Sequence, residues 1–366
     1  MMWVVIFGSL MLAGVLGLFY LLTRFHKFAP MQRLAQKHRF LSWLLALVPL
    51  GAVCLFALIN IPALIVVLIH LAVIWLVCDL AGAIVRKIAK KTERRRYIEG
   101  GFALVLTAFV LTAGWYLAHH VYETDYTFRT DKPLPDGRLR IVEIADLHLG
   151  ITLDGEGFAR ELEKVRAVRP DIIVIAGDYV DDDSTWEDTV IATKALGQVE
   201  TKYGIYYSIG NHDSGYFNSR SFTREMLYAE LEKNGIIALD DEAAEAAPGV
   251  TVLGRLDKSF SARAPIADLM EKIDPAQYVV CMDHQPNDYA NEAAANVDLV
   301  VSGHTHGGHI FPAGYIGLWM GANDRVYGTE TRGNTNFVVT SGISGWAIPF
   351  KTGTISEFCV IDIVQE

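Results

Sequence analysis

Three histidines fall within six residues in the glycine-rich stretch from Ser302 to His309. Imidazole nitrogens bind first-row divalent metals at neutral pH. In an extended segment the side chains of His304 and His306 point the same way, because side-chain direction repeats every two residues. The glycines between them allow the backbone to turn tightly and to approach a ligand. The stretch predicts metal binding, whereas a polar loop with chance histidines is the alternative, and the rest of the chain has to decide between them.

Five short apolar runs, each typical of a buried strand, are followed at once by Asp, Asn or His. The runs are residues 138–145, 171–176, 205–209, 278–282 and 297–301, and helical patterns at 158–169, 186–200, 222–234, 266–273 and 287–295 separate them. The clusters are Asp146-Leu147-His148, Gly177-Asp178-Tyr179-Val180-Asp181, Gly210-Asn211-His212-Asp213, Asp283-His284 and Gly303-His304-Thr305-His306. Each cluster alone also suits a helix cap or a turn. Five of them after five strands predict side chains that converge at one sheet edge.

These five blocks, in this order, resemble the calcineurin-like metallophosphoesterase superfamily over about residues 138–365. The continuation Gly307-Gly308 is similar to the bacterial membrane-associated branch. That branch usually has Gln where this chain has His309, which leaves the role of His309 open between substrate contact and loop packing. The resemblance implies an α/β four-layer sandwich (α-β-β-α) that holds two divalent metal ions.

The resemblance also implies a ligand set, carried over by motif position. The first metal would be bound by Asp146, His148, Asp178 and His306, and the second by Asp178, Asn211, His284 and His304. A carboxylate shared by two divalent ions stays ionised and holds them about 3.5–4 Å apart. Mixed nitrogen and oxygen ligands favour Mn, Fe or Zn over Mg or Ca.

The expected reaction is hydrolysis of a phosphomonoester, phosphodiester or pyrophosphate by metal-activated water. His212 binds no metal in this scheme, and we expect it to protonate the leaving oxygen or to hydrogen-bond the phosphoryl oxygen. Asp213 would orient His212 or raise its pKa. Asp181 suits two roles equally well: it could contact the metal ligands without binding metal itself, or it could lie in a surface turn.

The first third of the chain predicts an all-α membrane domain of four transmembrane helices. The apolar runs are residues 2–22, 40–59, 61–85 and 100–118, each long enough to cross a bilayer core. The third run contains His70 and Asp79, for which helix-packing hydrogen bonds and a pathway role are the two interpretations. The four cysteines show no regular spacing and predict no disulfide framework.

Charge divides the chain in the same place. Residues 1–120 hold 12 Lys/Arg and 3 Asp/Glu, a net of +9, and the remainder holds 20 and 39, a net of −19. An acidic domain repels nucleic-acid backbones, so no nucleic-acid partner is expected. The loops at residues 24–39 and 86–96 are basic, and the positive-inside rule places both in the cytoplasm and the acidic domain on the extracytoplasmic side of the cell membrane.

The sequence therefore predicts a transmembrane domain at 1–120, a polar linker at 121–137 and a metallophosphoesterase domain at 138–366. Two apolar segments follow the histidines, residues 309–320 and 345–350, and contain Trp319 and Trp346. They suit either the core of the domain or a membrane-facing lip that selects a lipid-linked phosphoester. The alternative function is a catalytically weak metal-binding sensor or regulatory domain on a transporter-like bundle.

Overall fold

The structure, a computed structural model, describes residues 2–90, 97–217 and 219–366. Residue contacts divide the chain into two compact units, Met1–Ala113 and Gly114–Glu366. The division falls inside the last N-terminal helix, a few residues before the domain end predicted at residue 120. Four basic residues of the second predicted cytoplasmic loop, Lys91, Arg94, Arg95 and Arg96, lie outside the described residues.

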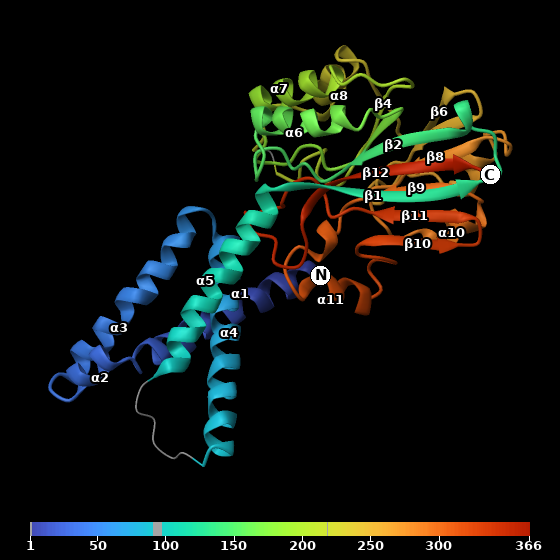
Figure 1. Cartoon of the computed structure of the whole chain (residues 1–366). Helices are drawn as coiled ribbons and strands as arrows, with labels where there is room; N and C mark the ends of the chain where they lie inside the picture. The colour runs from blue at the N-terminus through green and yellow to red at the C-terminus, as the bar shows by residue number, and fades with distance from the viewer. Residues whose placement is uncertain (1, 91–96, 218) are drawn as a thin grey trace. The chain divides into compact units, whose positions relative to one another are not determined.

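The N-terminal unit consists of apolar helices (Figure 1). They are α1 (Met2–Phe25), α2 (Ala29–Ala35), α3 (Arg39–Cys54) with the 3₁₀ turn η1 (Leu55–Leu58), α4 (Ile61–Ile88) and α5 (Ile98–His119). Three segments among the described residues are long and apolar enough to cross a membrane, namely Arg39–Leu58, Ile61–Ile88 and Ile98–His119. The apolar stretch described in α1, Met11–Phe25, is shorter than these, so the fourth span remains a prediction. Asn60 caps α4 by accepting a 2.7 Å hydrogen bond from the amide of Ala63.

The two ionisable groups singled out in the third run both have partners within this unit. Asp79 lies 3.2 Å from Nε of Arg24 and accepts a 3.0 Å hydrogen bond from the hydroxyl of Tyr97. Nδ1 of His70 lies 2.8 Å from the carbonyl of Val66, one turn earlier on the same helix. The Asp79 contacts join α4 to Arg24 of α1 and to Tyr97, the residue before α5, and the His70 contact lies within α4; both favour the helix-packing interpretation.

The second unit is built on two six-stranded sheets (Figure 1). The first has the order β1 (Val121–Thr130), β12 (Ser356–Gln365), β2 (Arg138–Ile144), β3 (Ile172–Ala176), β4 (Ile205–Ser208) and β5 (Ile236–Ala238). The second has the order β10 (Gly328–Arg332), β11 (Thr335–Val339), β9 (Leu299–Ser302), β8 (Tyr278–Met282), β7 (Val250–Gly254) and β6 (Glu242–Ala247). The helices are α6 (Gly155–Ala167), α7 (Trp186–Gly197), α8 (Arg224–Lys233), α9 (Ile266–Met270), α10 (Tyr289–Ala294) and α11 (Ala313–Trp319), with 3₁₀ turns η2 (Pro135–Gly137) and η3 (His306–Gly308).

Three apolar clusters fill this unit. One contains Phe158, Leu196 and Leu227 from α6, α7 and α8, packed against β2, β3 and β4, and Figure 1 shows these helices together on one side. A second draws on strands of both sheets, with Ile141 of β2 among its members. A third joins β7, β8, β9 and β11 to α9 and α10. Apolar side chains therefore pack helices against each sheet and the two sheets against each other. This packing holds the strand ends of both sheets in fixed positions.

The segment expected as a linker, residues 121–137, contains a strand, and the linker prediction was wrong for residues 121–130. Strand β1 pairs in parallel with β12 over its whole length, from Val121 opposite Ser356 to Thr130 opposite Gln365. Its polar composition misled the prediction because it is an edge strand. Every second side chain of β1 faces solvent, so alternation of polar residues is what such a strand requires.

Other elements were not predicted either, among them α2, β10, β6 and α11. Strand β6 reads Glu-Ala-Ala-Glu-Ala-Ala, a composition that favours helix, and pairing with β7 holds it as an edge strand. Helix α11 lies in the apolar segment after the histidines. The strands predicted before the five polar clusters are confirmed as β2, β3, β4, β8 and β9, but they belong to two sheets rather than to one edge.

Candidate metal centre

Five strand ends deliver the predicted site residues. Strands β2, β3 and β4 of the first sheet lead to Asp146 and His148, to Asp178, and to Asn211 and His212. Strands β8 and β9 of the second sheet lead to His284 and to His304 and His306. These groups all follow the carboxyl ends of strands, three in the first sheet and two in the second. The site therefore lies at the carboxyl ends of strands from both sheets.

The backbone leaves these strands in left-handed conformations that residues other than glycine rarely adopt. The angle φ is 53° at Asp146, 38° at His148, 52° at Asp178, 68° at His304 and 48° at His306. Such strain persists only where surrounding contacts fix it, and it concentrates at functional sites. Here the left-handed residues change the backbone direction directly after each strand, so the side chains no longer point to opposite faces in turn as they do in a strand.

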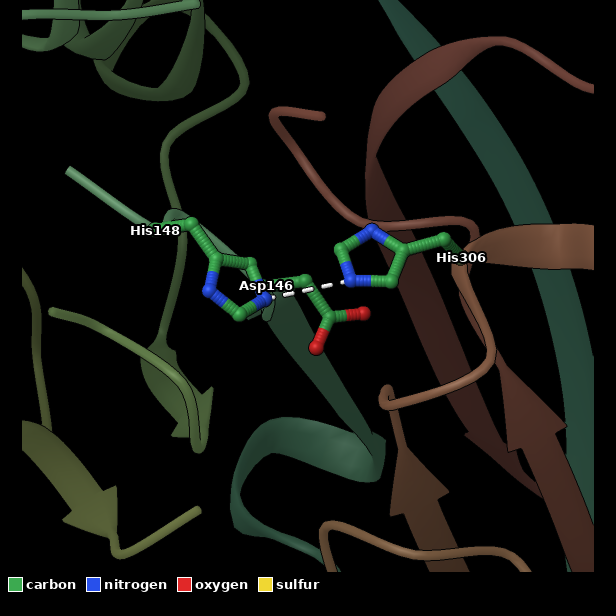
Figure 2. Close-up of side chains that lie close together, drawn as sticks. All are labelled: Asp146, His148 and His306. Carbon is green, nitrogen blue, oxygen red and sulfur yellow. Dashed lines mark hydrogen bonds between the residues drawn. The ribbon is translucent and has the colours of Figure 1, made fainter. Parts of the chain in front are cut away.

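The first group consists of Asp146, His148 and His306, which Figure 2 shows lying close together; Asp146 and His148 come from the segment after β2 and His306 from the segment after β9. One ligand atom of each lies within 4.8 Å of the others. Nε2 of His148 lies 3.1 Å from Nε2 of His306. Oδ2 of Asp146 and Nδ1 of His306 are buried and have no hydrogen-bond partner among the described residues. Buried polar atoms without partners are costly, so this group suits a bound cation.

The second group consists of Asp178, Asn211, His284 and His304. Nε2 of His284 lies 3.0 Å from Oδ2 of Asp178 and 3.1 Å from Oδ1 of Asn211, and Nδ1 of His304 lies 2.9 Å from the same Asn211 oxygen. Nδ1 of His284 lies 2.8 Å from the carbonyl of Ala176. That contact fixes the proton on Nδ1 and leaves Nε2 as the atom that faces the site.

Asp178 stands between the two groups. Its Oδ2 atom lies 3.0 Å from Nε2 of His284 and 3.5 Å from Nε2 of His148, so one carboxylate oxygen faces a histidine of each group. Burial raises the pKa of Asp178, but the facing imidazoles of His284 and His148 outweigh burial and hold this pKa below its usual range. Conversely, burial lowers the pKa of His284, and the charge of Asp178 raises it well above the usual value. A cation at this position would replace the proton that the pair shares.

The imidazoles of His304 and His306 have lone pairs for a metal at neutral pH, because their pKa values are lowered. Burial, together with the charge on His284, lowers the pKa of His304 to about 4. Burial, with His148 nearby, also holds the pKa of His306 well below its usual value. Neutral imidazole is the form that coordinates metals.

Two glycines allow the close approach that the site needs. A Cβ atom added at Gly210 would collide with the carboxylate and amide of Asp178, and one added at Gly177, where φ is 79°, would lie 2.6 Å from Nδ1 of His284. Alanine at either position would push a candidate ligand out of place.

The residue that contacts the predicted acid is Asp181, not Asp213. Oδ1 of Asp181 lies 3.1 Å from Nδ1 of His212, and its Oδ2 atom lies 2.8 Å from Nδ1 of His148. Burial lowers the pKa of His212, but the hydrogen bond to Asp181 and the charges of Asp178 and Asp181 outweigh it and raise this pKa. Asp181 therefore links a candidate ligand to the candidate acid, so the surface-turn interpretation of Asp181 was wrong.

Asp213 has a different environment from the one predicted. It is fully buried, and its two oxygens accept hydrogen bonds from the backbone amides of Asp178, Val180 and Gly210 at 2.8, 3.0 and 2.7 Å. It joins the loop after β3 to the loop after β4. The expectation that Asp213 orients His212 was wrong because the loop after β4 turns its side chain toward these amides.

Two aromatic residues lie beside His212: Trp346, which the sequence suggested as part of an apolar lip, and Tyr216, which sequence reasoning missed. The rings of Tyr216 and Trp346 lie 4.9 and 5.6 Å from the His212 ring, centroid to centroid, both in tilted or edge-on orientations. Nδ2 of Asn211 donates a 2.9 Å hydrogen bond to the hydroxyl of Tyr216. Because that hydroxyl accepts from Asn211, its own proton is free for another acceptor. Only the proximity of Tyr216 to the Asn211-His212 motif in sequence could have pointed to it.

His309 lies behind the first group. Its ring stacks on that of His306 at 5.4 Å between centroids, and its Nε2 atom is buried without a partner among the described residues. Burial and the charge of Lys351 lower the pKa of His309 to about 3. The ring is therefore neutral at physiological pH.

The sequence model described as calcineurin-like phosphoesterase matches residues 139–308. A metallophosphoesterase of Aquifex aeolicus is 31% identical over 197 residues, which cover 52% of this chain and 71% of that protein. The metallophosphoesterase YkuE of Bacillus subtilis is 25% identical over 276 residues, which cover 72% and 94% of the two chains. A transmembrane protein with metallophosphoesterase domain from Bos taurus is 27% identical over 239 residues, covering 60% of this chain and 51% of that protein.

With the geometry above, these matches define a metal-dependent phosphoesterase, an enzyme that hydrolyses phosphoester bonds. The chain belongs to the calcineurin-like phosphoesterase family, whose members generally use a dinuclear metal centre. The predicted family and reaction class are thereby confirmed. The apolar helices and the transmembrane relative indicate a membrane protein.

Proposed function

We propose that this chain is a membrane-anchored phosphohydrolase with two divalent metal ions, and that a lipid-linked phosphoester or pyrophosphate is its substrate. The observation that carries the proposal is the position of Asp178, one oxygen of which faces a histidine of each candidate ligand group. We assign the first ion to Asp146, His148, Asp178 and His306, and the second to Asp178, Asn211, His284 and His304. The unit from Gly114 onward would carry this site, in a four-layer sandwich with residues 138–366 as its catalytic domain.

The donor set supports Mn, Fe or Zn as the metals. It combines four imidazoles with carboxylate and amide oxygens, and such mixed sets suit these ions better than Mg or Ca, which prefer oxygen alone. Ions held there supply Lewis acidity, which offsets phosphoryl charge and lowers the pKa of a water.

The protein groups around the metals divide the remaining work. Water oxygen forms a bond to phosphorus while the bond from phosphorus to the leaving oxygen breaks, and the attacking water releases one proton to solvent. In our proposal protonated His212 gives its proton to that leaving oxygen, and Asp181 keeps His212 protonated and oriented. The free hydroxyl proton of Tyr216 donates to a phosphoryl oxygen, since this hydroxyl already accepts from Asn211. The half-buried His309 stacks on His306 and would support that ligand rather than touch substrate.

Two features support a lipid-linked substrate. Trp346 lies against His212 and so lines the side from which the leaving group departs. Trp319 is 78% exposed on the segment that follows the candidate ligands. Both would contact the apolar part of a substrate held in the outer leaflet. We further propose four spans, and the basic loops between them support an extracytoplasmic catalytic unit by the positive-inside rule.

The test is a hydrolysis screen of the full chain in lipid nanodiscs with added Mn. Substrates are a long-chain lipid phosphate, a lipid pyrophosphate and a small aryl phosphodiester. We expect turnover that His304→Ala abolishes. Trp319→Ala and Trp346→Ala should raise KM for the long-chain substrates and leave the aryl diester unchanged. Equal effects on both substrate kinds would remove the lipid assignment, and absence of turnover with every substrate would favour the metal-binding regulatory domain.

A further inference from the structure

A group of large apolar side chains on and around α11 is exposed. We call it the α11 patch, and its members are Phe311, Tyr315, Ile316, Trp319 and Met320, which are 63, 54, 46, 78 and 52% exposed. Residues 309–323 contain no Asp, Glu, Lys or Arg. A contiguous apolar surface without charge marks an interaction site with a protein or a membrane, since water solvates it poorly.

The start of this segment is hydrogen-bonded to a loop of the same unit. The amides of Thr352 and Gly353 each donate a 3.0 Å hydrogen bond to the carbonyl of His309. The amide of Phe311 donates a 3.3 Å bond to Oγ1 of Thr352. A Cβ atom added at Gly308 of η3 would lie 3.0 Å from Cα of Gly314 in α11. Helix α11 therefore packs tightly on the turn that contains the candidate ligand His306.

The same loop holds the end of α5. The amide of Lys351 donates a 2.9 Å hydrogen bond to the carbonyl of Gly114, and Nζ of this buried lysine donates to the carbonyls of Ser341, Gly342 and Ile355 at 2.7, 3.1 and 3.0 Å. A Cβ atom added at Gly114 would lie 2.8 Å from Cγ2 of Thr352. All these atoms belong to the unit that begins at Gly114. The loop at Lys351–Gly353 is thus hydrogen-bonded both to the start of the α11 segment, at His309, and to Gly114 in the last turns of a candidate membrane span.

Those last turns display interfacial aromatic residues. Trp115 and Tyr116 of α5 are each 50% exposed, and α5 ends at His119, one residue before β1 begins. Tryptophan and tyrosine concentrate at the level of the lipid headgroups, where an apolar ring and a polar atom are both satisfied. Since α5 is long and apolar enough to span a bilayer, Trp115 and Tyr116 would lie at the membrane surface where a spanning α5 leaves the bilayer.

We propose that the α11 patch inserts into the headgroup zone of the bilayer that α5 crosses. The occupant is lipid rather than a second copy of the chain, because the loop at Lys351 and Thr352 holds the patch at the exit of a span, where lipid is always present. The docking would place His304 and His306, the candidate metal ligands that closely precede the patch in sequence, near the membrane surface. The proposal depends on α5 being a span and not on the chemistry proposed for the metals.

The experiment attaches an environment-sensitive bimane label to single cysteines in the full chain, reconstituted in phosphatidylcholine nanodiscs. The labelled positions are Ile316→Cys, Trp319→Cys and Met320→Cys. The matched control is Ile237→Cys, an apolar side chain 44% exposed on the edge strand β5. The unsubstituted chain measures background labelling of the four native cysteines, two of which are buried. Brominated phosphatidylcholine reports contact with acyl chains, and iodide reports contact with water.

We expect brominated lipid to quench the label at 316, 319 and 320 several-fold more than at 237, with iodide showing the reverse order. Equal quenching by iodide at all four positions would overturn the proposal. Protection from iodide without quenching by brominated lipid would also overturn it and would identify a protein partner instead. Neither quenching measurement requires turnover, so the experiment tests bilayer docking independently of the proposed hydrolysis.

Discussion

The replacement Asp213→Asn separates the structural role found for Asp213 from the catalytic role that its motif suggests. Asp213 accepts hydrogen bonds from the amides of Asp178, Val180 and Gly210 with its two oxygens. Asparagine has one oxygen, which can keep the two amides that Oδ2 now serves. Its NH₂ group would then face the amide of Val180, donor against donor.

The cost follows from these three bonds. One buried amide left without an acceptor costs about 1–3 kcal/mol, and the two bonds that remain lose their charge assistance, about 1 kcal/mol each. The free energy of unfolding should therefore fall by about 3–5 kcal/mol. For a unit of this size that corresponds to a Tm lowered by about 6–20 °C.

The matched control is Asp181→Asn, which removes one carboxylate charge of the same site but leaves those amides paired. We expect its Tm to stay within about 2 °C of the parent. Its rate should fall about 10–100-fold, the usual cost of losing a group that orients a metal ligand. Tm is measured by intrinsic fluorescence and the rate with an aryl phosphodiester, on the full chain in nanodiscs. If Asp213→Asn kept the parent Tm and lost as much rate as His212→Ala, our assignment of Asp213 to loop packing would be refuted.

Three further predictions concern the metals, the acid and the topology. Asp178→Ala and His304→Ala should each lower bound metal, measured by elemental analysis, and reduce turnover by several orders of magnitude, since a dinuclear site acts as a unit; normal occupancy in Asp178→Ala would contradict the ligand assignment. His212→Ala should keep both metals and lose about 10²–10⁴ in rate. The contact with Asp181 raises the pKa of His212 above 6.5, so kcat should fall as pH rises through that raised pKa. In Asp181→Asn the fall in kcat should move to lower pH. An unchanged pH profile would contradict the contact between Asp181 and His212 as the cause of the raised pKa. A cysteine placed after Glu123 should react with an impermeant reagent from outside the cell and one between Arg86 and Arg96 only from the cytoplasm, and swapped labelling would move the catalytic unit to the cytosol.

Much of the fold was predictable because local pattern determines local structure here. Strands β2, β3, β4, β8 and β9 are short apolar runs bounded by polar residues, and α6 is an amphipathic helix that starts at the capping residue Asp154. Strand β1 was not predictable in the same way. Its alternating polar residues suit an edge strand and a connector equally well, and only pairing with β12, more than two hundred residues later, selects the strand.

By itself the sequence determined which residue types could bind metal and where they fall relative to the strands. Metal chemistry restricts ligands to a few side chains, and strand ends are readable locally, so the five polar clusters could be recognised; the resemblance to the family then named seven candidate ligands among them. The tertiary structure decided which side chains meet. His212 lies next to Asp213 in sequence, yet its ring meets Asp181, thirty-one residues earlier, because the loops after β3 and β4 lie side by side. Contacts between such loops depend on how two strands pack, which no local pattern encodes.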